Sequence, residues 1–261
     1  MKEPTDSGSS RTGDNQTVTL LAKQTRSLLD AKLTAFFSDL AEQLFTLSSV
    51  TTLPKSLRPK AFEAYAQMKA QQRALVEAYL RDIDDGFVNL INPDKPTRHS
   101  AIRHNATTDE LDLIDLDEFN DDLAINRMAQ TALGRHWRAL EAITLRVAKA
   151  VSADPKHIEL PIGPQKLAKL YRNNTKIFEF APAILREIDQ FFLKELLLTM
   201  GDIYKKSNEL LTDRGLMPDI EKKIDLQGSQ LADDVEKAKL ETPQQPQPKG
   251  GSSRLNSDLI E

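Results

Sequence analysis

Apolar residues recur every three or four positions along most of the chain, from about residue 18 to about residue 221. This period places them on one side of an α-helix, whereas a half-buried β-strand would alternate apolar and polar residues. Segments that contain proline, glycine or β-branched residues interrupt the periodic stretches. The pattern therefore predicts an all-α fold, an antiparallel bundle of about five helices of which four are long.

The predicted helices fall into two groups along the chain. Residues 18–91 would form a helical hairpin that is broken at the "SSVTTLP" segment, and residues 110–226 would form a helical bundle. Between the two groups, residues 92–109 contain two prolines and no apolar period, which is typical of a loop. The two groups could be subdomains hinged at this loop. Residues 1–17 are predicted to be a disordered tail, and residues 227–261 a low-complexity tail rich in Pro, Gln, Gly and Ser.

Within the second group, the helix that ends near residue 151 is expected to bury large apolar side chains. Leu123, Leu133 and Trp137 would lie in the core with Leu140. The same helix carries several basic residues, Arg146 among them, against a single opposing Glu141. A shorter helix is predicted to begin at Pro164, and a last long helix is predicted over about 182–213. That last helix would end before Gly215, a residue suited to the left-handed conformation.

Basic residues follow the "PIGP" tetrad that opens the shorter helix. Lys166, Lys169, Arg172 and Lys176 come at steps of three, three and four, so their side chains could reach a common side. The first turn of the helix, after Gly163, also offers unpaired backbone N–H groups to an anion. One hypothesis is a site for a phosphorylated ligand or an acidic partner. The alternative is a solvated helix face at a plain corner between two helices.

An acidic segment precedes the helix that ends near residue 151. Eight of the fourteen residues from 109 to 122 are acidic, and they include Asp115, Asp117, Glu118, Asp121 and Asp122. The pair Asp115 and Glu118 has the spacing of a capping box, and carboxylates are stabilised at a helix start by about 0.3–1 kcal/mol each. A solvated helix start is one interpretation, and docking to a basic partner is the other. A calcium loop is not expected because the required glycine is missing.

Several kinds of chemistry lack their sequence signatures. The chain has no cysteine, and its four histidines form no metal-binding spacing, so no metal site is expected. The "GxSxG", "GxGxxG" and Walker patterns are also missing, so no cofactor and no catalytic residue is expected. A net charge of −4 makes nucleic acid an unexpected partner. We expect no membrane span and no secretory leader, and the missing cysteines suit the cytoplasm.

Five stretches together carry a family resemblance. They are, in order, "LLDAKLTAFFSDLAEQLF", "AFEAYAQMKAQQRALVEAYLRDIDDGF", "LDLIDLDEFNDDLAINRMAQTAL", "IGPQKLAKLY" and "IYKKSNELLTDRGLMPDIE". Over roughly residues 18–221 the chain resembles the N-terminal region of the proteobacterial domain of unknown function 1631 family. The resemblance implies an N-terminal portion or a shortened member, because the family's proteins are typically longer. It implies no agreed activity, and the thymidine phosphorylase label of some relatives does not fit a chain without an α/β lobe.

These observations lead to one expected function and two alternatives. The leading expectation is a non-enzymatic cytoplasmic helical interaction or adaptor module whose partners are other proteins, self-association included. The first alternative is a sensor that binds a phosphorylated nucleotide or another anion at the Gly163–Pro164 helix start. The second alternative is an enzyme of unknown type.

Overall fold

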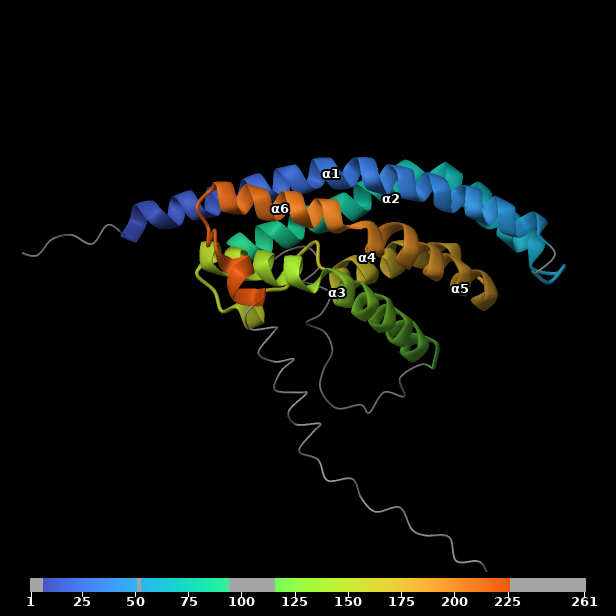
Figure 1. Ribbon diagram of the computed structural model, residues 1–261. Helices are drawn as coiled ribbons and strands as arrows, with labels where there is room; N and C mark the ends of the chain where they lie inside the picture. Colours follow the sequence, from blue (N-terminus) through green and yellow to red (C-terminus); the bar gives the residue numbers. More distant parts are fainter. Residues whose placement is uncertain (1–6, 51–52, 94–115, 226–261) are drawn as a thin grey trace, which may run out of the picture. The chain divides into compact units, whose positions relative to one another are not determined.

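A computed structural model describes residues 7–50, 53–93 and 116–225 of the chain (Figure 1). These residues contain no strand, which confirms the all-α fold class. The described residues up to Glu221 form one compact unit. Its α-helices are α1 (Ser7–Ser49), α2 (Arg58–Ile91), α3 (Leu116–Val151), α4 (Pro164–Thr175), α5 (Pro182–Phe191) and α6 (Gly201–Asp213).

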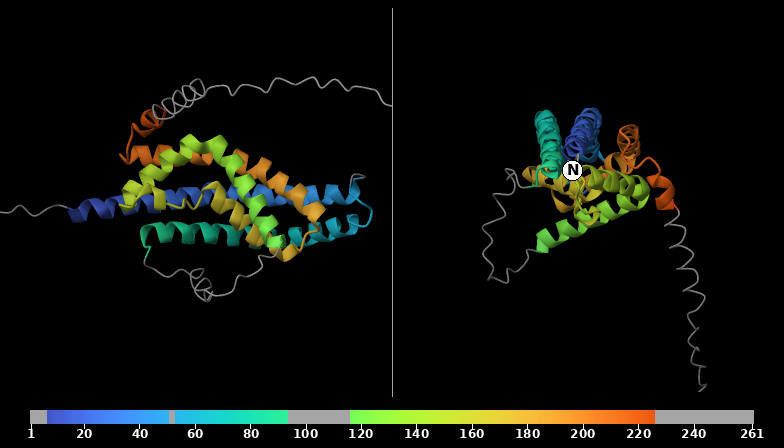
Figure 2. Two further views of the ribbon diagram at one scale, coloured as in Figure 1. Left: turned by 90° about the horizontal axis from the view of Figure 1, so that it is seen from below. Right: turned by 90° about the vertical axis from the view of Figure 1, so that its left-hand side faces the viewer.

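Helices α1 and α2 form the antiparallel hairpin that the apolar period predicts (Figures 1 and 2). The hairpin is held together by leucine and phenylalanine side chains of α1 that pack against buried side chains of α2. The buried residues of this interface include Leu33, Phe37, Leu40, Leu44, Ala61, Ala64, Met68, Val76 and Tyr79. Burial of each large side chain stabilises the fold by about 1.5–3 kcal/mol, which makes this hairpin the main apolar surface on which the other helices pack.

The first helix begins at Ser7, eleven residues before the predicted start at residue 18. The boundary was placed too late because the apolar period begins at Val18, which is fully buried. A helix does not need apolar residues to continue, since each added residue gains a hydrogen bond once the costly first turn exists. Residues 1–6 and 226–261, where the remaining parts of the two tails were expected, lie outside the described residues.

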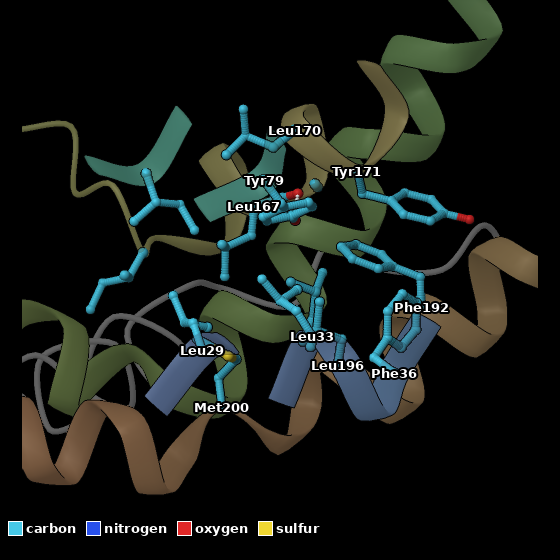
Figure 3. Close-up of a cluster of buried hydrophobic side chains, with 14 of the residues drawn as sticks. Leu29, Leu33, Phe36, Tyr79, Leu167, Leu170, Tyr171, Phe192, Leu196 and Met200 are labelled. Atoms are coloured by element: carbon cyan, nitrogen blue, oxygen red, sulfur yellow. Dashed lines mark hydrogen bonds between the residues drawn. The ribbon is translucent and has the colours of Figure 1, made fainter. Parts of the chain in front are cut away.

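One buried core joins the two groups of helices, so it does not divide at residues 92–109. The Tyr79 hydroxyl of α2 donates a hydrogen bond to the Leu167 carbonyl of α4. Phe36 of α1 lies 5.7 Å from Phe192, between ring centroids, and Phe192 follows α5. Figure 3 shows these side chains meeting in one cluster with Leu29, Leu33 and Met200. Residues 94–109 of the expected loop lie outside the described residues.

The long helix expected over 182–213 is interrupted. Between α5 and α6 the chain forms a π-helical turn, η4 (Phe192–Leu196), and a 3₁₀ turn, η5 (Leu197–Thr199). The Leu197 N–H reaches the Phe192 carbonyl five residues back, so this turn holds one extra residue. As a result Leu196 and Leu197, which are adjacent in sequence, are both fully buried. The apolar period did not indicate this break.

The "PIGP" tetrad forms a corner that fixes three helices. Gly163 and Pro164 occupy the cap and the first position of α4, as the sequence predicts. The Ile162 carbonyl accepts a hydrogen bond of 2.9 Å from the Tyr204 hydroxyl of α6. Pro161 lies so close to α2 that a Cβ atom placed on Gly86 would be 2.9 Å from the Pro161 Cβ. The corner is therefore part of the core, and its glycines and prolines have a packing role.

The close approach of Pro161 to α2 gives a stability prediction. Gly86→Ala is expected to lower the free energy of unfolding by about 1–3 kcal/mol, because the added methyl must push the corner away. Gly134→Ala is the matched control, since a Cβ atom there meets nothing within 4 Å. Gly134→Ala is expected to raise the free energy of unfolding by roughly 0.4–1 kcal/mol, because alanine lowers the conformational entropy of the unfolded chain. Urea unfolding of both variants checks the difference, and equal stabilities would contradict it.

Candidate functional site

The basic side chains of α4 do not share one face: Lys166 is partly buried, Lys169 is exposed and Arg172 is buried. Arg172 is only 3% exposed, and its side chain extends from α4 to acidic residues of α3 and α5. Its Nη2 donates to the Asp189 carboxylate at 2.7 Å, and its Nε lies 3.6 Å from Asp121. Helix α4 is short and packs against other helices on several sides. Arg172 is therefore buried, although it follows Lys166 and Lys169 at helical spacing. The assignment of Arg172 to a solvent-facing site was wrong.

The structure separates the remaining members of the predicted site. Gly163 and Lys166 line a groove beside the start of α4, and Lys166 is partly buried there. Lys169 and Lys176 are exposed and do not line this groove. Only the helix start and its first lysine therefore remain together.

The predicted acidic site is only partly described. Asp121 is half-buried and belongs to the Arg172 cluster, whereas Asp122 is exposed. Asp115 lies outside the described residues, as do the side chains of Asp117 and Glu118. For Asp121 a structural role is therefore visible, namely an ion pair that ties the start of α3 to α4.

The groove lies between α3 and the segment that leads into α4, with a volume of about 390 Å³. Its walls are mainly apolar, with a few polar side chains along the edge. The lining residues from α3 include Ala129, Leu133 and Leu140, and those from the corner segment include Ile158, Leu160 and Pro164. Gln130, Glu159 and Lys166 supply polar groups at the same groove. Such a surface suits an apolar side chain or helix face better than a phosphate group.

Large apolar side chains of α3 that were expected in the core are exposed. Leu123, Leu133 and Trp137 each retain about two fifths of their surface, between 39% and 40%. The buried stripe of α3 instead runs through Ile125, Met128, Ala132, Ile143 and Val147. Alanines line part of that stripe because small side chains let helices approach closely. Helix α3 therefore has two apolar faces. The three residues that were predicted to be buried lie on the face that is exposed.

A second arginine, one of the basic residues noted on the helix that ends near residue 151, is also in the core. Arg146 is 0% exposed and makes hydrogen bonds with every nitrogen of its guanidinium group. The bonds to Glu221 measure 2.6 and 2.8 Å, and Asn208 Oδ1 accepts another at 2.5 Å. The carbonyls of Leu216 and Met217 accept the remaining two. Arg146 therefore holds the turn after α6 against α3.

That turn explains a motif seen in the sequence, "IYKKSNELLTDRGLMP". Gly215 has a φ of +78°, the left-handed conformation expected for a residue that ends a helix. Asn208 accepts from Arg146 and donates to the Ala139 carbonyl at 2.9 Å. Partial burial would raise the pKa of Glu221, but its hydrogen bonds from Arg146 outweigh this effect and lower the pKa. These motif residues are structural, because each is engaged in holding the turn.

The acid–base groups of the interior are likewise engaged in packing. Burial raises the pKa of Asp189, and the neighbouring Arg172 guanidinium opposes this increase. Burial also raises the pKa of Tyr171, whose ring stacks on Phe192 with centroids 3.9 Å apart (Figure 3). Burial lowers the pKa of His136, whose Nε2 lies 3.2 Å from the Leu197 carbonyl.

Two further searches bear on the site. Among the residues that the structure describes, no group of three His, Asp or Glu side chains is arranged to hold a metal ion. In the same part of the chain, no helix combines the length and the apolar character that a membrane crossing requires.

The groove was missed by the sequence analysis, although a signal for it exists. Leu133 and Trp137 are one helical turn apart, and so are on one face of α3. What the sequence did not reveal is the partner segment, Ile158–Pro164, which forms the other wall.

Comparisons with known proteins agree with the family resemblance. The family model described as protein of unknown function (DUF1631), N-terminal domain, matches residues 14–215. This match confirms the resemblance found in the five sequence stretches. Neither the comparison with curated proteins nor the comparison with solved structures gives a match.

Proposed function

Since the chain belongs to the family of proteins of unknown function DUF1631, whose name states no activity, we propose a function from its surfaces. The protein is a non-enzymatic helical interaction module of the cytoplasm. It binds an amphipathic helical segment of a partner protein in the groove between α3 and the start of α4.

The observation that carries this proposal is the apolar face of α3 beside the groove. Leu133 lines the groove and is 40% exposed, and Trp137 lies one turn further along the same face. An amphipathic helix binds such a surface by inserting side chains spaced three and four residues apart. Tryptophan is among the residues that contribute most to binding when a partner covers them. The buried arginines Arg146 and Arg172, by contrast, are engaged in ion pairs with Glu221 and Asp189.

The charges near the groove suit a partner segment with acidic residues. Arg127 and Arg135 of α3 are exposed, and Lys166 and Lys169 extend from α4. Glu159 is the carboxylate among the groove's lining residues. Positive side chains around an apolar groove favour association with a negatively charged helix and raise its association rate.

The anion-sensor alternative has weaker support than the helix-binding function. It relied on Gly163, Lys166, Lys169 and Arg172 acting on one ligand. Arg172 is engaged with Asp189 and Asp121, and Lys169 does not line the groove. A phosphorylated ligand would meet one lysine and apolar walls, which is a poor environment for a multiply charged group.

Photocross-linking from the groove tests the proposal. With p-benzoylphenylalanine in place of Leu133, we expect a cross-linked partner segment that is helical, amphipathic and acidic. The same probe in place of Arg81, an exposed residue of α2, is the positional control. A synthetic peptide of the cross-linked segment should then shift the emission of Trp137 to shorter wavelength, because Trp137 is the chain's single tryptophan and is partly exposed.

A point variant makes this test quantitative. Leu133→Asp is expected to weaken peptide binding about tenfold or more, since truncating a central interface residue commonly costs over 1 kcal/mol. Thr131→Asp is the matched control, because Thr131 is exposed on α3 and does not line the groove. Equal binding by the two variants, or no position-specific cross-link at residue 133, would reject the groove as the binding site.

A further inference from the structure

The α3 wall of the groove belongs to a longer line of side chains. The line follows alternating steps of three and four along the helix and consists of Leu123, Asn126, Gln130, Leu133, Trp137, Leu140 and Thr144. Four of the seven line the groove, and Leu123 and Trp137 continue the line outside it, 39% and 40% exposed. We call these residues the α3 seam. Side chains with this seven-residue repeat are the ones that a second helix contacts when it lies lengthwise along the first.

Gly134 gives an independent sign that another backbone comes close. It is an exposed residue in the middle of α3, where glycine is less favourable than alanine by about 0.8–1.0 kcal/mol. No contact among the described residues requires a glycine here, since a Cβ atom at this position would meet nothing within 4 Å. Gly134 follows Leu133 and precedes Trp137 by one turn, so it flanks the seam. A residue without a side chain at this flank lets two helix axes approach closely.

Basic residues lie at the N-terminal end of the seam. Gln165 of α4 donates a hydrogen bond of 2.7 Å to the Asn126 side chain, so the start of α4 lies beside this end. The next residue in each helix, Lys166 and Arg127, is basic, and Arg127 is exposed. Positive charges at this end favour acidic residues on a neighbouring helix.

Acidic residues lie at the other end of the seam. The segment between α3 and α4 leaves the C-terminal end of α3 and returns to the start of α4, so Glu159 near its beginning lies toward the C-terminal half of the seam. Glu141 is exposed on the same half of α3. The N-terminus of a helix carries a partial positive charge, which suits this end, and its C-terminus then lies toward Lys166. The charges therefore favour a second helix that runs antiparallel to α3.

Resting on the helix-binding function above, we propose that the partner helix lies lengthwise on the α3 seam and runs antiparallel to α3. Its backbone comes closest to α3 at Gly134, and its acidic residues are concentrated in its C-terminal half, beside Arg127 and Lys166. Gln130 fixes the register, because a polar residue in an apolar seam needs a polar group opposite it. The partner is thus a helix of about three heptads with a polar residue in the middle of its apolar stripe.

Two synthetic peptides of about 21 residues test the direction of this helix. Both carry leucine at the heptad contact positions, one central glutamine and the same glutamates. The glutamates lie in the C-terminal half of the first peptide and in the N-terminal half of the second. We expect the first peptide to shift the Trp137 emission to shorter wavelength, and the second to bind about fivefold more weakly at low salt. Equal binding of the two, or no binding of either, would overturn the inference.

The absence of cysteine from the chain allows a second test of the geometry. A cysteine is moved along the first peptide, and disulfide formation is measured with Leu123→Cys and with Gln130→Cys of the full chain. The peptide position that links best to residue 123 should lie seven residues nearer the C-terminus than the position that links best to residue 130. Thr131→Cys, which is adjacent to Gln130 but off the seam, is the control and should link poorly. The reverse order, or a link between two copies of Gln130→Cys that excludes the peptide, would contradict the proposal.

Gly134→Leu tests the close approach. The free chain should keep its circular dichroism spectrum, because leucine is a good helix former and the site is open. Binding of the first peptide should weaken about tenfold or more, since the added side chain separates the helices. Thr131→Leu is the matched control and should bind as the wild type does. Equal binding by Gly134→Leu would reject the close approach. A chain that cross-links a helical segment from residue 133 but fails these tests retains the groove function and loses the antiparallel seam.

Discussion

Arg146→Met is expected to lower the free energy of unfolding by about 3–5 kcal/mol, because each buried acceptor that loses its donor costs about 1–3 kcal/mol. The loss arises because Asn208 Oδ1 and the carbonyls of Leu216 and Met217 would keep their burial and lose their donor. Methionine can fill part of the volume, so the expected loss comes mainly from the polar groups. Urea unfolding of the purified chain measures it.

Arg135→Met is the matched control for this prediction, because Arg135 lies on the same helix and is exposed. Its effect should stay within about 0.5 kcal/mol, as for most surface substitutions. Arg146→Lys should recover only part of the stability, since one ammonium group cannot serve acceptors in four directions. Equal losses for Arg135→Met and Arg146→Met would contradict the structural role of Arg146.

The pH dependence gives the same prediction a second readout. The pKa of Glu221 is lower in the folded chain than its ordinary value, because Arg146 donates hydrogen bonds to the carboxylate. Because the pKa of Glu221 is lower in the folded chain, its ionised carboxylate stabilises the fold at any pH above its unfolded pKa, about 4.3. This stabilisation is lost as the pH falls through the pKa of Glu221 in the folded chain. The stability difference between wild type and Glu221→Gln should therefore be present at pH 7 and narrow below about pH 4. The effect should be modest because the Glu221 side chain is 49% exposed.

Arg172→Met is expected to cause a second large loss of stability, about 3–5 kcal/mol at neutral pH. The reason is Asp189, whose side chain is only 14% exposed and whose ion pair with Arg172 measures 2.7 Å. Without Arg172 the Asp189 carboxylate would remain buried without its positive partner, and the negative charge of Asp121 would further disfavour its ionised form. The result would also show that Arg172 supports the fold, in contrast to the ligand-binding role expected from the sequence.

Two measurements separate this effect from a general packing defect. Burial already raises the pKa of Asp189 above its ordinary value, and removing Arg172 should raise it further. A raised folded pKa makes the ionised group destabilising at high pH, so the Arg172→Met chain should regain stability as the pH falls from 7 through that pKa. The double variant Arg172→Met with Asp189→Leu should likewise recover much of the loss, because no unpaired charge remains. A double variant less stable than Arg172→Met would reject the account.

The approximate position of most helices could be predicted because helix formation depends on neighbouring residues. The apolar period, the Pro164 start of α4 and the Gly215 end of α6 are local signals, and the structure contains each of these features. The interruption at Phe192–Leu196 was not predictable in the same way. It follows from which surfaces meet in the core, and the local sequence remains compatible with a continuous helix.

The sequence by itself determined the helices, the corner at the start of α4 and the membership of the family. Only the tertiary structure decided which face of each helix is covered. Arg146 and Arg172 are buried, whereas Trp137 and Phe62 are exposed, although hydrophobicity alone would order them the other way. The reason is that burial depends on which neighbouring helices pack against a face. Arg146 is accepted inside because a carboxylate, an amide oxygen and two carbonyls from distant segments pair with every nitrogen of its guanidinium group. An aromatic ring stays outside when none of the described helices packs over it.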